Sequence, residues 1–198
     1  TRAIELALSR ISANAVETRW SDAAIQTAPW QKAQSDPAWA GEMILRDFRE
    51  VITDAPIEKV WESIEQIGGE NGWYGADFLW FMRGLLDRAI GGVGLRRGRR
   101  DPKTLRIGES LDFWRVENIE KGKLLRLYAE MILPGKAWLE FRVSEVDGKT
   151  KIIQEATFAP HGLGGQLYWY SILPLHSFVF PTMLRNIVRS AKRKVLFG

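Results

Sequence analysis

Alternating apolar and polar residues over 109–159 are the clearest pattern in the chain. The alternation forms four runs of about eleven residues, separated by the turn sequences NIEKGK, LPGK and VDGK. Asp147–Gly148 is a favoured two-residue hairpin turn, and Pro134–Gly135 is a turn pair. This pattern predicts a four-stranded antiparallel meander. Strands of this length are longer than most and are typical of a curved sheet.

The hairpin at Asp147–Gly148 also predicts a register. It places on one mostly apolar face Ala137, Leu139, Phe141, Val143, Ile152, Gln154, Ala156 and Phe158. If the Pro134–Gly135 loop spans three residues, this face also receives Leu127, Ala129 and Met131. Glu130 then lies opposite Glu140, and Glu140 opposite Glu155, on an outer face where exposed carboxylates contribute little catalysis. A two-residue loop would direct Glu130 into the interior instead, but the apolar alternation favours the three-residue loop.

Upstream of the meander, the pattern predicts one strand and two helices. In the segment 42–55, Ile44, Phe48 and Ile52 alternate with charged residues, as in a half-buried strand. The segment 56–69 has an apolar helical stripe, and Asp54 is a candidate cap. A second helix is predicted over 76–90. Residues 1–40 contain a short amphipathic helix and a connector, so we predict a division into 1–40 and a domain over 41–198.

Residues 156–184 contain no charged side chain, which raises the question of a membrane anchor. Pro174 and Pro181 argue against a straight lipid-facing helix. After Leu184 the sequence becomes amphipathic, with Arg185 and Arg189 on the polar side. The apolar face of the predicted sheet must be covered, and this segment is long and apolar enough to cover it. We therefore predict a buried C-terminal helix, not a bilayer span.

The composition narrows the possible functions. Of 198 residues, 45% are hydrophobic and 26% charged, with nine Trp and nine Phe, which suits a thick core or an apolar cavity wall. The absence of cysteine excludes disulfides and thiolate chemistry, and two histidines exclude a His-rich metal site. The net charge of +4 is concentrated around Arg96–Arg100 and after residue 184, so no nucleic-acid face is expected. We expect a cytoplasmic protein.

The predicted order of strand, two helices, meander and long helix is an α+β arrangement. It resembles the START-like (SRPBCC, helix-grip) superfamily of lipid-binding and polyketide-cyclase proteins, in which a curved antiparallel sheet wraps a long C-terminal helix. Five motifs resemble an uncharacterised START-like family: IGGENGWY (67–74), RGLLDRAIGGVGLRRGRRDP (83–102), LDFWRVE (111–117), AEMILPGKAWLEFRV (129–143) and GLGGQLYWYSILPLH (162–176). Its members commonly follow an NAD(P)-binding, epimerase-like domain of the short-chain dehydrogenase type. Residues 1–22 similarly resemble the tail of that domain.

The glycine-rich segment GGVGLRRGRR (91–100) is a candidate phosphate site. A dinucleotide fingerprint, however, needs a strand before its glycines and a helix after them. Here a predicted helix precedes and Asp101–Pro102 follows, so no cofactor site is expected in this chain. Arg97 and Arg99 could bind an anionic group, or could belong to a solvated loop.

Eight residues are candidates for the wall of a ligand cavity: Trp73, Tyr74, Asp112, Trp114, Phe141, Trp169, Tyr170 and His176. His176 follows Trp169 by seven residues, so both project from similar sides of the helix. His176 is either a hydrogen-bonded core residue or, in a cavity, the plausible general base. Asp112 shares strand parity with Trp114 and marks either the polar end of a pocket or a surface position.

The sequence thus predicts a binding module for a mostly hydrophobic, lipid- or polyketide-like molecule, oriented by one or two hydrogen bonds. The family resemblance implies an accessory role beside an NAD(P)-dependent oxidoreductase or epimerase domain. Two alternatives stay open. One is a cyclase- or hydrolase-like enzyme that uses His176 or Asp112, although no catalytic motif is present. The other is a structural or oligomerisation domain without a ligand.

Overall fold

The computed structural model describes residues 43–69, 72–75, 88–89, 91–92 and 99–196. The predicted N-terminal helix and connector lie outside these residues. So does the predicted helix over 76–90, apart from Arg88 and Ala89, which are helical.

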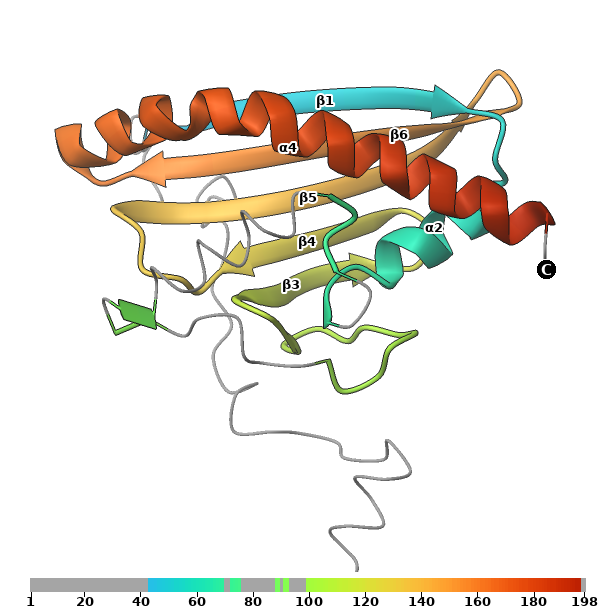
Figure 1. The fold of residues 1–198 in the computed structure, drawn as a ribbon, viewed down its shortest axis with the longest axis horizontal. Coiled ribbons are helices and arrows are strands. Elements are labelled where there is room, and N and C mark those ends of the chain that lie inside the picture. Colours follow the sequence, from blue (N-terminus) through green and yellow to red (C-terminus); the bar gives the residue numbers. More distant parts are fainter. Residues whose placement is uncertain (1–42, 70–71, 76–87, 90, 93–98, 197–198) are drawn as a thin grey trace, which may run out of the picture.

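Six antiparallel strands form one curved sheet in the order β1-β6-β5-β4-β3-β2 (Figure 1). The strands are β1 (Leu45–Thr53), β2 (Ser110–Leu111), β3 (Trp114–Glu120), β4 (Leu124–Ala129), β5 (Gly135–Val146) and β6 (Lys149–Pro160). The predicted meander is therefore correct, with its first strand divided by a tight turn into β2 and β3. The upstream strand β1 pairs with β6 and forms one edge of the sheet, and β2 forms the other edge.

Two helices lie on the concave face of this sheet. The helix α4 (Gly162–Leu196) runs along the sheet over β1 and β6, and α2 (Ile57–Glu65) packs against α4 and against β5 (Figure 1). Pro174 and Pro181 both lie inside α4. Within the described part of the chain, no helix combines the length and hydropathy that crossing a bilayer requires. The fold is an α+β helix-grip, with the sheet wrapped around the long C-terminal helix.

The register of the meander is correct in one hairpin and displaced in the other. The β5–β6 hairpin pairs Val143 with Ile152 and Ala137 with Phe158, as predicted. Between β4 and β5, the predicted pairing of Glu130 with Glu140 would place Leu127 opposite Val143. In the structure Leu127 lies opposite Leu139, a displacement of four residues. The reason is that residues 130–134 do not continue the pairing between β4 and β5. The Glu130 amide donates to Phe113 O at 2.9 Å, and the His161 amide donates to Pro134 O at 2.9 Å. Because the displacement is even, the predicted faces are retained.

The predicted orientation of β1 is wrong. Phe48 and Ile52 are 51% and 53% exposed, on the outer face. The inward positions include Asp47 and Arg49, which lie opposite Ala156 and Gln154 of β6. A buried carboxylate is tolerated here because Arg49 Nε donates to Asp47 Oδ1 at 2.8 Å. The pairing with β6, and not the apolar alternation, determines which side of this edge strand faces α4.

The start of α2 also differs from the prediction. Its N-cap is Pro56, without a side-chain hydrogen bond, and Asp54 instead forms an ion pair with Lys149 at 3.2 Å. The predicted apolar stripe of the helix is confirmed, since Val60, Trp61 and Ile64 are buried.

The outer face of the sheet carries six charged side chains in contact, which we call the outer ladder: Glu117, Arg126, Glu140, Arg142, Glu155 and Arg46. Arg126 Nε lies 2.5 Å from Glu140 Oε2, and Arg46 Nη1 lies 3.2 Å from Glu155 Oε1. Glu140 and Glu155 are opposite each other as predicted. However, they are only 3% and 7% exposed, so the expectation of exposed carboxylates is wrong. Arginine neighbours neutralise them.

Candidate functional site

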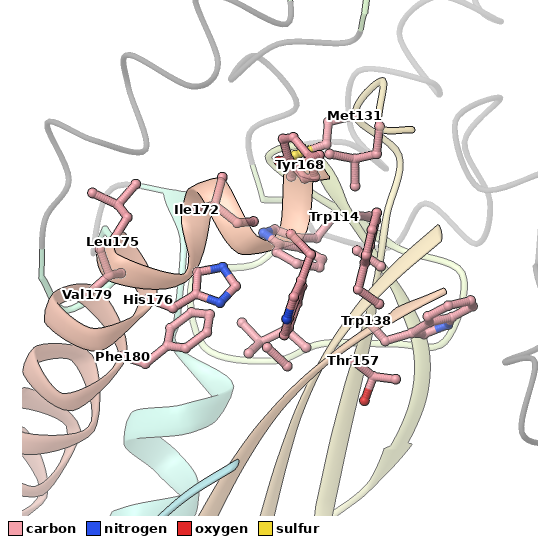
Figure 2. Close-up of a pocket in the computed structure, with 17 residues that line it drawn as sticks. Trp114, Met131, Trp138, Thr157, Tyr168, Ile172, Leu175, His176, Val179 and Phe180 are labelled. Atoms are coloured by element: carbon pink, nitrogen blue, oxygen red, sulfur yellow. The ribbon is translucent and has the colours of Figure 1, made fainter. Parts of the chain in front are cut away.

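A cavity of about 130 Å³ lies between the first half of α4 and the concave face of the sheet (Figure 2). Its lining is mostly apolar and comprises Trp114, Ala129, Met131, Leu133, Ala137, Leu139, Ala156, Phe158, Tyr168, Trp169, Ile172, Leu175, His176, Val179 and Phe180. Trp138 and Thr157 also border it, although their side chains belong to the outer face by strand alternation. Three alanines on adjacent strands leave the space that rings from α4 enclose.

Close backbone contacts fix the start of α4 above this cavity. A Cβ atom at Gly165 would lie 2.4 Å from Pro134 O and 2.7 Å from Pro160 Cβ. Only glycine allows the helix to approach the β4–β5 connection this closely. The position of the helix start, and with it the width of the cavity, therefore depends on Gly165.

Aromatic rings from α4 and β6 form one wall. Trp169 stacks on Phe158 with ring centroids 5.8 Å apart and an interplanar angle of 6°. The edge of His176 meets Trp169 at a centroid distance of 5.2 Å, and His176 also contacts Phe180 at 4.5 Å. Figure 2 shows His176 and Phe180 projecting from α4 toward the strands. The predicted common orientation of Trp169 and His176 is confirmed.

His176 is the histidine of this wall, and its surroundings keep it neutral. Burial lowers the pKa of His176 from 6.5 to about 4; the nearby Asp47 carboxylate opposes this shift and Arg49 adds to it. His176 Nδ1 lies 3.7 Å from Asp47 Oδ2, which is longer than a hydrogen bond. Asp47 is instead held by Arg49. At neutral pH the cavity therefore presents an uncharged imidazole.

Trp114 also borders the cavity, but its indole nitrogen is enclosed by neighbouring side chains. Its indole packs against Trp73 and Phe113, with centroids 6.0 Å and 5.8 Å away. The Nε1 atom is buried, and no described residue accepts a hydrogen bond from it. His176 Nδ1 is also buried without a hydrogen bond within the described residues.

Trp73 and Asp112 are brought together, but outside the cavity lining. Trp73 Nε1 donates to Asp112 Oδ2 at 2.9 Å, and the Gly69 amide donates to the same oxygen at 3.3 Å. Asp112 has a φ of 54° in the turn between β2 and β3. Tyr74 is attached to α4, where Asn186 Nδ2 donates to its carbonyl at 2.6 Å. These residues fasten the 72–75 segment to the sheet and to α4.

The other predicted site residues have different positions. Phe141 is fully buried in the core, and Tyr170 is 60% exposed on α4, so neither lines the cavity. Arg99 donates to four backbone carbonyls, those of Glu65, Ile67, Asp101 and Thr104. This role at the end of α2 accounts for Arg99 without an anion. Arg97 lies outside the described residues, so anion binding by the pair stays a prediction.

Several lining residues, and the carboxylate beside His176, were not predicted from the sequence. Met131, Leu133, Ile172, Val179 and Phe180 line the cavity, and any of them could equally have belonged to a filled core. Asp47 was missed because the apolar alternation of β1 assigned it to the outer face. The opposite phase of that strand would have revealed a carboxylate facing the helix.

Solved structures with the same general arrangement are distant in sequence. The aromatase/cyclase Zhui from Streptomyces sp. R1128 has a TM-score of 0.43 at 12% identity, over 77% of this chain and 96% of that one. Protein MLL2253 from Mesorhizobium loti has 0.44 at 13%, over 75% and 98%. Ara h 8.0201 has 0.38 at 13%, over 79% and 100%. With TM-scores below 0.5, these similarities carry no functional conclusion.

Sequence comparison places the chain in a family. No curated protein matches it significantly. Residues 39–183 match the model of the family described as "Protein of unknown function (DUF2867)", which spans most of the chain and nearly the whole of the described fold. The cavity and the sheet that forms it lie within this match. The chain therefore belongs to the DUF2867 family, and its curved sheet and long C-terminal helix have the helix-grip arrangement.

Proposed function

We propose that this domain binds a small, mostly apolar molecule in the cavity between α4 and the concave face of the sheet. The observation that carries the proposal is the lining itself, in which aromatic and aliphatic side chains predominate and His176 supplies an imidazole. Ligand pockets commonly combine an apolar wall with a few polar groups that fix orientation.

The volume limits the size of the ligand. Cavities that enclose drug-sized molecules usually measure roughly 300–1,000 Å³, whereas this one measures about 130 Å³. An engineered apolar cavity of about 150 Å³ binds benzene. The cavity in its present form therefore suits a single ring, or the apolar end of a longer lipid- or polyketide-like molecule.

A titration with toluene tests the proposal. Toluene should bind to the chain with millimolar or better affinity, measured by NMR shift changes of the cavity methyl groups. Ala137→Leu should abolish this binding because the added carbons occupy the cavity. Lys136→Leu is the matched control, since the neighbouring residue lies on the opposite face of β5. Failure of toluene to bind, or equal binding by both variants, would contradict the proposal.

We further propose that the domain acts as an accessory module to an NAD(P)-dependent oxidoreductase or epimerase domain. The support is the resemblance of the motifs and of residues 1–22 to proteins with that organisation. In such a full-length protein, Ala137→Leu should change substrate selectivity, whereas a purely structural domain would change only stability. Unchanged selectivity would favour the structural role.

A catalytic role is the second candidate, because His176 lines the cavity beside Asp47. Asp112 is a weaker candidate, since it is occupied by Trp73 and the Gly69 amide. A general base is most effective when its pKa lies near the working pH, and the pKa of His176 is about 4. The neutral imidazole is thus better suited to hydrogen bonding than to proton abstraction. A His176→Asn variant that loses turnover but keeps ligand affinity would favour catalysis.

A further inference from the structure

We infer that the cavity recognises the polar group of its ligand through His176, and selects an uncharged hydroxyl-bearing ring compound over the corresponding carboxylate. This inference rests on the proposed binding function and specifies the chemistry of the ligand.

His176 defines what the polar group of the ligand must offer. A neutral imidazole has one donor and one acceptor nitrogen. The Nδ1 atom lies 3.7 Å from a carboxylate oxygen of Asp47, which can only accept. This neighbour favours the proton on Nδ1 and leaves Nε2 as an acceptor. A ligand group that approaches Nε2 should therefore donate, as a hydroxyl does.

The charges around His176 disfavour an anionic ligand. Asp47 and Arg49 of β1 are the charged groups that face it, while its neighbours on α4 are the rings of Trp169 and Phe180. Arg49 is already engaged by both oxygens of Asp47. A ligand carboxylate would lose its hydration close to Asp47 and meet an uncharged imidazole. A hydroxyl group provides both a donor and an acceptor without this penalty.

Three probes of similar size separate these requirements: toluene, phenol and benzoate. At pH 7 we expect phenol to bind roughly five to ten times more tightly than toluene, the effect of one or two additional hydrogen bonds. Benzoate should bind at least about ten times more weakly than phenol, since an uncompensated buried charge is costly. Isothermal titration of the whole chain measures all three affinities without any mutation.

A variant identifies the residue responsible. His176→Phe keeps a ring in place and removes both nitrogens, so it should reduce the preference for phenol over toluene. Phe180→Leu is the control, because it alters the same wall without a polar atom and should preserve the preference. If toluene binds but phenol binds no better, or if benzoate binds best, the inference is wrong while the proposed function stands. If none of the three binds, both are wrong.

Discussion

Burial against aromatic rings gives His176 a pH dependence that an exposed histidine lacks. Its pKa is 6.5 in an unfolded chain and about 4 in the folded one. Between these values the unfolded state binds the proton more readily than the folded state. The free energy of unfolding therefore falls as the pH is lowered from about 6.5 toward 4, and above 6.5 this contribution is fully present.

Replacing His176 by Phe should remove this contribution. The difference between the two pKa values corresponds to roughly 3 kcal/mol. Denaturant unfolding at pH 7, 6, 5 and 4.5 should show a smaller loss of stability in His176→Phe than in the unmodified chain. The exposed His161 provides the control, and His161→Asn should follow the unmodified chain. Identical pH profiles for all three proteins would show that His176 is not buried as described.

Asp112 illustrates how one side chain can meet two local requirements. It adopts a positive φ of 54°, which Asn tolerates and Ala does not, and it accepts the buried N–H of Trp73. Asp112→Asn should therefore cost about 1 kcal/mol or less, and Asp112→Ala roughly 2–4 kcal/mol. Chemical denaturation measures both. Equal costs would mean that neither the turn nor the hydrogen bond matters to stability.

Local sequence determines the register of one hairpin of the sheet, whereas residues distant in sequence determine the register of the other. Asp147–Gly148 fixes the β5–β6 hairpin by itself, so its register was predictable. The β4–β5 connection is held by Phe113 and by the start of α4, and a loop length inferred from Pro134–Gly135 could not reveal those partners.

The residues of the candidate site divide in the same way, into those that local sequence predicts and those that distant contacts position. Trp169 and His176 were found because their spacing of seven residues is a property of one helix. Asp47 was missed because an edge strand can expose apolar residues such as Phe48 and still pair correctly with β6. Trp73 and Asp112 were predicted to line the cavity, but they form a hydrogen bond with each other instead. This contact joins two segments that are distant in sequence, and no local pattern predicts it.

Two adjacent glycines at the start of α4 give a matched test of the helix position. A Cβ at Gly165 would clash with Pro134 and Pro160, whereas a Cβ at Gly164 would meet nothing within 4 Å. Gly165→Ala should cost roughly 1–3 kcal/mol and weaken ligand binding, because the helix start must move away from the cavity. Gly164→Ala should be neutral or stabilising by up to about 1 kcal/mol. Thermal unfolding compares them, and similar effects from both would contradict the described contact.

The outer ladder extends across the sheet from the edge strand β1 to β3 and so connects five of its strands. Its members differ greatly in exposure, since the side chain of Arg126 is 10% exposed and that of Arg46 is 54% exposed. Removing one partner of a buried ion pair leaves an uncompensated charge, while removing an exposed partner has little effect.

Arg126→Met should therefore destabilise the fold by roughly 3–5 kcal/mol, and Arg46→Met by about 1 kcal/mol or less. Urea unfolding of both variants provides the measurement. The loss should shrink at low pH as Glu117, whose pKa is raised by burial, becomes protonated and no longer needs the charge of Arg126. A loss that does not depend on pH would indicate a packing defect and not an unpaired charge.

The two prolines within α4 have a consequence for how the cavity opens. Proline has no amide hydrogen, so the carbonyls of Tyr170 and Ser177 receive no helical hydrogen bond from positions 174 and 181. The residues between the prolines include His176, Val179 and Phe180, which form the cavity wall. The helical turns above the cavity therefore have fewer backbone hydrogen bonds than the turns near Ile187. Backbone amides over 175–180 should exchange with deuterium faster than those over 185–191, and an occupied cavity should slow them.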